Sequence, residues 1–145
     1  NIKLIERLRE QESGVYAPGV RAGYHKNPSG RYSITVYFGC APENVDKMIN
    51  ATLEEIAKIK QNGAQPADIQ KFVAKEARST QEQLKENVFW AGYLASSSQN
   101  QENPDQILSH VSNLSQVTVQ STKDAANKYL NDKNFIKLIL MPEKK

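Results

Sequence analysis

The chain has 145 residues and a mass of 16.3 kDa, which is the size of one domain. Hydrophobic residues make up 39% and charged residues 24%, an ordinary composition for a domain that buries a core. The net charge is only +3, and the two signs are interleaved along the chain, so the charge pattern does not favour a nucleic-acid partner. A single cysteine excludes an internal disulfide and a multi-cysteine metal site, and no apolar run approaches the roughly 20 residues of a membrane span.

The first part of the chain predicts a helix followed by two strands. Residues 2–11 carry apolar side chains at helical spacing, and the helix is expected to end before Ser13-Gly14, where glycine can adopt a left-handed turn. Residues 15–24 are rich in Val, Tyr and Ala but contain a proline, which indicates an irregular or edge strand. Residues 31–40 alternate apolar and polar positions, so the two segments together predict an antiparallel hairpin.

The middle of the chain predicts helices. Residues 45–59 have the strongest apolar stripe, and that helix is expected to end at Asn62-Gly63. A second helix begins near Pro66 and is expected to run to about residue 97. A short helix over 105–114 and a last helix capped by Thr118 follow.

Residues 135–141 are nearly all apolar and predict a closing strand. The order of helix, strand, strand, helices and strand is an α+β layout, with an antiparallel sheet covered on one face by helices. Three strands make a narrow sheet for so much helix, so we expect further strands of the same domain before Asn1. The absence of a start methionine also indicates a piece of a longer chain.

The residue types that carry catalysis are sparse. His25 and His110 lie far apart and form no helical zinc motif, so each is interpreted as a surface histidine. Cys40 ends a strand with no histidine near it in sequence and is interpreted as a core residue. The chain has no nucleophile-elbow motif, phosphate loop or dinucleotide fingerprint. The sequence therefore predicts no catalytic and no metal-binding residue in this chain.

A basic, aromatic face on the hairpin is an alternative feature. Arg21, Lys26 and Arg31 are interspersed with Tyr24 and Tyr32, a combination that can bind single-stranded nucleic acid. The small net charge favours an ordinary mixed strand surface instead. A nucleic-acid or small-ligand binding module stays open as an alternative function.

One local pattern is more specific. The run from Leu8 to Tyr16 places Arg9 at a helix end and Tyr16 at the start of a strand. Such a junction lets a guanidinium and a phenol point the same way across a short gap. These groups are suited to hold peptide carbonyls, or the oxyanion that forms when water attacks one. The alternative is a solvated arginine and a packed strand tyrosine, and the residues alone leave both open.

The same run resembles the helix-to-strand junction in the C-terminal half of the pitrilysin/insulinase (M16) zinc peptidases. Residues 32–45 resemble the family's strand followed by a Pro-Glu-Asn helix start, and residues 84–90 resemble the Asn-x-x-Trp element of bacterial members. Residues 135–142 resemble the closing strand. The four motifs occur in the family's order and cover nearly the whole chain.

The resemblance implies that residues 1–145 form the C-terminal part of a single M16-like α+β domain, of the LuxS/MPP-like metallohydrolase type. In the family, the zinc motif His-x-x-Glu-His lies in a separate N-terminal catalytic domain, so zinc is expected there and no cofactor is expected in this chain. The implied role is to enclose an unfolded peptide opposite that zinc site. Arg9 and Tyr16 match the family's substrate-binding arginine and tyrosine by spacing.

The resemblance also implies partners and a compartment. We expect the chain to pair with the catalytic domain of a parent zinc metallopeptidase and to contact unfolded peptide, with no nucleic acid and no membrane span. Some relatives have lost the zinc motif and act as scaffold or partner subunits, so that role stays open. Bacterial members of this type are often found in the periplasm or cell envelope. An exposed sheet edge would favour self-association of the chain.

Overall fold

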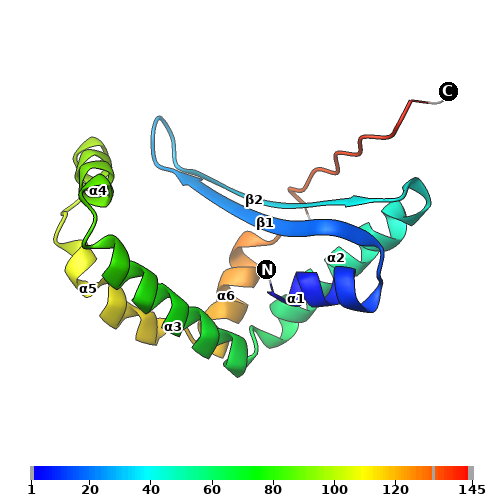
Figure 1. Cartoon of the computed structure of the whole chain (residues 1–145), viewed down its shortest axis with the longest axis horizontal. Coiled ribbons are helices and arrows are strands. Elements are labelled where there is room, and N and C mark those ends of the chain that lie inside the picture. The colour runs from blue at the N-terminus through cyan, green and yellow to red at the C-terminus, as the bar shows by residue number, and fades with distance from the viewer. Residues whose placement is uncertain (1, 132, 144–145) are drawn as a thin grey trace. The chain divides into compact units, whose positions relative to one another are not determined.

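The computed structural model describes residues 2–131 and 133–143, which fold into helices and one hairpin (Figure 1). The described residues divide into two compact units. The junction unit comprises residues up to 23, 33–63 and those from 123 on, and the helical unit comprises residues 24–32 and 64–122. The elements are α1 (Ile2–Ile5), η1 (Glu6–Gln11), β1 (Val15–His25), β2 (Arg31–Cys40), η2 (Pro42–Asn44), α2 (Val45–Asn62), α3 (Pro66–Gln83), α4 (Asn87–Asn100), α5 (Gln106–Asn113), η3 (Leu114–Gln116) and α6 (Val119–Tyr129).

The predicted hairpin is confirmed. Strands β1 and β2 pair in a sheet that has two strands within the described residues (Figure 1). Pro18 lies inside β1, where it can be tolerated because a strand of a two-stranded sheet has one edge that needs no ladder partner. Gly19 follows it against Tyr37 of β2, and a Cβ at this glycine would lie 2.4 Å from the phenol oxygen. A larger residue at position 19 would therefore have to displace the end of the Tyr37 side chain, which is 43% exposed.

The core of the junction unit lies between the hairpin and two helical segments. Its buried side chains come from α1 and η1, from the start of β1 and from α2, and they are Leu4, Leu8, Val15, Met48 and Ala51. Val36, Phe38 and Cys40 of β2 alternate along the strand and pack against this cluster. Helices thus cover one face of an antiparallel sheet, which confirms the expected α+β class.

The first helix ends in an unexpected way. After Ile5 it widens into a π-helix, and the N–H of Glu12 donates to the carbonyl of Arg7, five residues earlier, at 3.2 Å. The expected left-handed glycine is wrong, because Ser13 adopts that conformation with a φ of 50°. Gly14 lies close to α2 instead, since a Cβ there would lie 2.9 Å from Cε of Met48 and would displace the end of that buried side chain.

The expected long helix after Pro66 is wrong in two respects. It is divided into α3 and α4, and the indole N–H of Trp90 donates to the carbonyl of Leu84 at 2.8 Å, satisfying an acceptor where α3 ends. The second helix also continues through the serines to Asn100, beyond the expected end. Serine disfavours a helix interior only weakly, and the helix stops at Gln101, which adopts a left-handed conformation with a φ of 56°.

The remaining helices match the sequence prediction. Helix α2 ends at Gly63, whose φ is 71° and whose N–H donates to the carbonyl of Ile59 at 2.8 Å. The hydroxyl of Thr118 accepts the N–H of Ser121 at 3.0 Å, which caps α6 as expected. Among the described residues, none of the helices is both long enough and apolar enough to cross a bilayer.

The expected closing strand over residues 135–141 is wrong for this structure. The segment forms neither helix nor strand, and it follows α6 as an irregular trace at the red end of the chain (Figure 1). Its side chains are largely exposed, with Leu138 at 92% and Leu140 at 98%. A strand requires a neighbour that accepts and donates its backbone hydrogen bonds, and the described residues supply none.

Candidate functional site

The two residues singled out by the sequence are both exposed, and each follows a buried anchor. Arg9 lies in η1 directly after Leu8, which is fully buried, and Tyr16 lies in β1 directly after Val15, which is also buried. The side chain of Tyr16 is 83% exposed. Because Leu8 and Val15 belong to one core cluster, the backbone beneath Arg9 and Tyr16 is fixed at two points of the same core.

The backbone around Tyr16 adopts unusual conformations. Ser13 and Ala17 have φ values of 50° and 45°, in the left-handed region that residues with a Cβ seldom occupy. Each such residue costs on the order of 1–3 kcal/mol and persists only where the surrounding structure holds it. The turn from Ser13 to Ala17 is thus determined by the packing around it, and a Cβ added at Gly14 of this turn would lie 2.9 Å from Cε of Met48.

The side chains of Arg9 and Tyr16 have no partner among the residues that the structure describes. Within residues 2–131 and 133–143, neither the guanidinium nor the phenol makes a hydrogen bond, an ion pair or a ring contact. They therefore do not bind one another, and their hydrogen-bonding groups are open to solvent or to a ligand. A guanidinium offers a fork of donors, and a phenol can both donate and accept.

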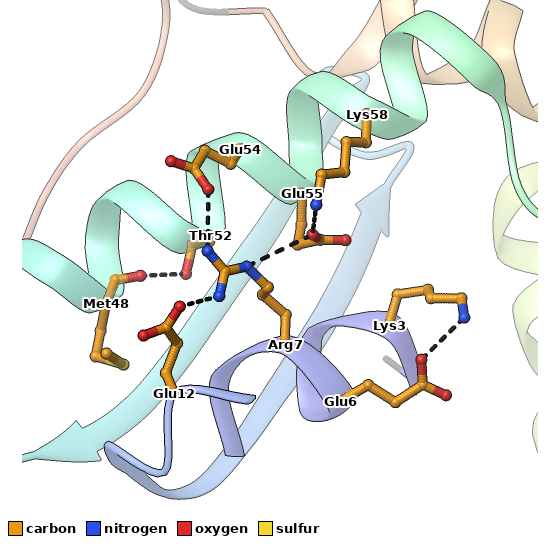
Figure 2. A network of polar contacts seen from close by, with 9 residues as sticks. All are labelled: Lys3, Glu6, Arg7, Glu12, Met48, Thr52, Glu54, Glu55 and Lys58. Carbon is orange, nitrogen blue, oxygen red and sulfur yellow. Dashed lines mark hydrogen bonds and ion pairs between the residues drawn. The ribbon is translucent and has the colours of Figure 1, made fainter. Parts of the chain in front are cut away.

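A network of charged side chains connects η1, the turn before β1 and α2 (Figure 2). Nη1 of Arg7 pairs with Oε1 of Glu12 in the turn. Nη2 of Arg7 lies 3.1 Å from Oε2 of Glu54, and its Nε lies 3.9 Å from Oε1 of Glu55, both on α2. The guanidinium of Arg7 thus joins η1, the turn before β1 and α2.

Two lysines complete the network. Nζ of Lys47 lies 2.7 Å from the second carboxylate oxygen of Glu12, and Nζ of Lys58 lies 2.5 Å from Oε1 of Glu55. The side chains of Arg7, Glu12 and Glu55 are only 20%, 16% and 12% exposed. Each partly buried charge therefore has at least one partner of opposite sign, which burial requires.

Sequence reasoning did not identify this network. Arg7 and Glu12 are five residues apart, a spacing that does not bring side chains together on an α-helix. The π-helix hydrogen bond from Glu12 to Arg7 places one above the other. The sequence shows only that Arg7 follows the apolar Leu4 by about one helical turn. It does not show that the helix widens into a π-helix at this point.

The other candidate residues lie apart from this junction. His25 is exposed at the end of β1, and Nε2 of His110 lies 3.4 Å from a carboxylate oxygen of Glu76 in the helical unit. Cys40 is half-buried and packs against the core, as interpreted from the sequence. In the described part of the chain, no three His, Cys, Asp or Glu side chains come together as a metal site. The described residues therefore do not offer zinc a ligand set.

The basic face of the hairpin is partly occupied by internal contacts. The guanidinium of Arg21 lies over the ring of Tyr37, 5.0 Å from its centroid. Nζ of Lys26 lies 3.1 Å from Glu102 and donates to the carbonyl of Asn100 at 3.0 Å. Two of the three cations on this face thus have partners within their own units.

Comparison with known proteins identifies the family. The family model described as the Peptidase M16 inactive domain matches residues 1–76, just over half of the chain. The chain therefore belongs to the M16 peptidase inactive-domain family, as the resemblance of its motifs implied.

Two similar proteins are much longer. A protein of Arabidopsis thaliana named zinc protease PQQL-like is 29% identical over 93 residues, which cover 61% of this chain and 10% of that protein. The crystal structure of the periplasmic protease PqqL from Escherichia coli matches with a TM-score of 0.70 and 23% identity. That match covers 90% of this chain and 15% of the Escherichia coli chain, and it supports the same fold. The chain thus spans about a tenth to a seventh of these relatives.

Proposed function

We propose that this M16 inactive domain positions an unfolded peptide substrate opposite a zinc site carried by another domain of a larger peptidase. The observation that supports this role is that Arg9 and Tyr16 are exposed and have no side-chain partner among the described residues, while each directly follows a buried residue of one core, Leu8 or Val15. Such a support holds functional groups in place while leaving them accessible. Rigid elements give a functional group the positional accuracy that substrate binding requires.

The chemistry of the two side chains fits a peptide backbone. The Arg9 guanidinium would donate charge-assisted hydrogen bonds to peptide carbonyl oxygens. The Tyr16 hydroxyl would donate to the same region, where negative charge develops on the carbonyl oxygen during hydrolysis. Neither residue forms a covalent bond or moves a proton in this proposal, so the chain contributes binding and charge stabilisation.

The rest of the proposal concerns the parent, by which we mean the full-length protein that carries this chain. Residues 1–145 would be the C-terminal part of one α+β domain that pairs with an N-terminal catalytic domain holding zinc. The names of the relatives, a zinc protease and a periplasmic protease, support a proteolytic parent in the periplasm or cell envelope. An inactive scaffold or partner subunit is the competing role.

We also propose that the isolated chain self-associates. Residues 135–141 expose a nearly continuous apolar run, and the outer edges of the hairpin carry backbone groups without a ladder partner among the described residues. An apolar segment that forms no strand in the single chain and a sheet with open edges are complementary between two copies, because the segment of one copy can extend along the sheet edge of the other. The contact would be reciprocal, so it would close as a dimer.

The test of peptide positioning uses Arg9→Ala and Tyr16→Phe in the full-length parent, assayed on an unstructured fluorogenic peptide. Each substitution should lower kcat/KM roughly tenfold or more, the scale of one lost transition-state hydrogen bond. Arg31→Ala and Tyr24→Phe are matched controls, because both side chains are exposed on the same hairpin. The controls should retain the activity of the unchanged protein.

Two outcomes would contradict the proposal. Full activity of both Arg9→Ala and Tyr16→Phe would remove the role of these side chains. A parent that carries no zinc motif and hydrolyses no peptide would support the scaffold role instead.

A further inference from the structure

We propose that Arg7 is a positioning residue, which holds the turn between Arg9 and Tyr16 by clamping Glu12 against α2. This inference rests on the proposed peptide-positioning role of that junction. Its evidence is separate, however, because it comes from the charge network around the partly buried Arg7 and Glu12 and not from the exposed pair. Arg7 itself would not touch the peptide, since its guanidinium is already occupied by three carboxylates.

The first step concerns connectivity. Glu12 lies in the segment that joins Arg9 to Tyr16, three residues after the first and four before the second. Its carboxylate is held by Arg7 on one oxygen and by Lys47 of α2, 2.7 Å away, on the other. Glu12, in the middle of the turn, therefore forms ion pairs with η1 and with α2. These two elements also supply the core residues Leu8 and Met48.

The second step concerns geometry. The hydrogen bond from the N–H of Glu12 to the carbonyl of Arg7 closes the widened π turn, and the ion pair joins the same two residues through their side chains. Two links between one pair of residues determine the width of the turn. Because η1 ends at Gln11, a change in that width would move Ser13 and the residues after it.

The third step concerns strength. The Arg7–Glu12 pair is only 20% and 16% exposed, so water and salt screen it less than a surface pair. Its planar guanidinium faces Glu12 and α2 at the same time, an arrangement that a lysine cannot reproduce. By contrast, the Arg78–Glu82 pair on α3 is 2.9 Å long but largely exposed, and it joins two residues of one helix.

The first experiment needs no catalytic activity. Amide hydrogen exchange is measured by mass spectrometry on the 145-residue chain and on its Arg7→Met, Arg7→Lys and Glu12→Gln variants. All three should speed exchange in the segment 12–17 by roughly tenfold, while α2 stays as protected as in the unchanged chain. Arg78→Met is the matched control and should leave the segment 12–17 unchanged. Glu12→Gln keeps the shape of the side chain, so it reports the charge link even if Arg7→Met destabilises the whole unit.

The second experiment is a double-mutant cycle in the full-length parent. Arg7→Met should lower kcat/KM roughly tenfold, because small displacements of positioned groups cost that much or more. If Arg7 acts through Arg9 and Tyr16, adding Arg7→Met to an Arg9→Ala/Tyr16→Phe protein should cost less than about twofold. A general loss of folded protein would instead reduce both backgrounds by the same factor.

The outcomes separate this inference from the proposed function. Unchanged exchange in the segment 12–17 for all three variants, or a full tenfold effect of Arg7→Met in both backgrounds, would overturn the positioning role. Loss of activity in Arg9→Ala and Tyr16→Phe together with full activity in Arg7→Met would overturn it as well, while leaving the proposed function intact. Full activity in Arg9→Ala and Tyr16→Phe would instead overturn the proposed function, and the exchange data would still decide whether Arg7 holds the turn.

Discussion

The junction from Leu8 to Tyr16 and the apolar segment over residues 135–141 differ in one respect that decides their structure. Both contain large apolar side chains, but only those of the junction are covered by other elements within the described chain. Leu8 and Val15 pack with Met48 of α2, and Glu12 in the turn between them forms an ion pair with Arg7. Among the described residues, the apolar segment has no ladder neighbour, and none of its side chains belongs to the buried core.

This difference shows what an apolar pattern can and cannot predict. The pattern identifies side chains whose burial is favourable, since each removes apolar surface from water. It does not identify the surface that will cover them. A helix satisfies its own backbone hydrogen bonds, whereas a strand depends on a second segment, so the prediction of a lone strand is the more fragile.

The largest expected effect comes from a matched pair of leucine substitutions, one in each region. Leu8→Ala removes a fully buried side chain and should lower the free energy of unfolding by about 2–5 kcal/mol. Leu138→Ala removes a side chain that is 92% exposed and should change it by no more than about 0.5 kcal/mol. Urea unfolding of the chain, at a concentration where it is monomeric, measures both.

The comparison between the two regions would fail if Leu138→Ala lowered the free energy of unfolding as much as Leu8→Ala, or if neither substitution lowered it. A cost for Leu138→Ala equal to that of Leu8→Ala would mean that the apolar segment is buried in the monomer. Equal, small costs for both would mean that the junction has no cooperative core.

A smaller effect is expected on association. Sedimentation velocity should show a dimer that dissociates across a hundredfold dilution, because exposed apolar strands pair with sheet edges. The double substitution Leu138→Lys/Leu140→Lys places two charges on one side of the segment 135–141 when that segment is extended along a sheet edge, and it should leave a monomer at all concentrations. Val88→Lys is the control, because Val88 is 81% exposed on α4 and lies outside the segment. A chain that stays monomeric throughout, or a dimer that persists in the double variant, would contradict this account.

Much of the fold could be predicted from local patterns. The hairpin, the end of α2 at Gly63 and the Thr118 cap each depend on residues close in sequence, so period and capping chemistry were sufficient. The division between α3 and α4 was missed, because the apolar stripe continues across it. The break is stabilised by a contact from Trp90 back to Leu84, which a periodic pattern does not contain.

The candidate site also has a part that the sequence predicts and a part that it does not. Arg9 and Tyr16 could be singled out from their spacing and the chemistry of their side chains, and their exposure agrees with a binding role. Arg7 could not be singled out, because its contacts depend on a π-helix and on carboxylates of α2 more than forty residues away. The sequence contains these residues but not the width of the turn that joins them.

Photo-crosslinking tests the central claim most directly. In the full-length parent, p-benzoylphenylalanine replaces either Tyr16 or Tyr24, and each protein is irradiated with an unstructured peptide. Both tyrosines are exposed on β1, at 83% and 71%, so they differ mainly in their distance along the strand from the junction. The account predicts a crosslink to the peptide from position 16 and little or none from position 24. No crosslink from position 16, or equal yields from the two positions, would contradict it.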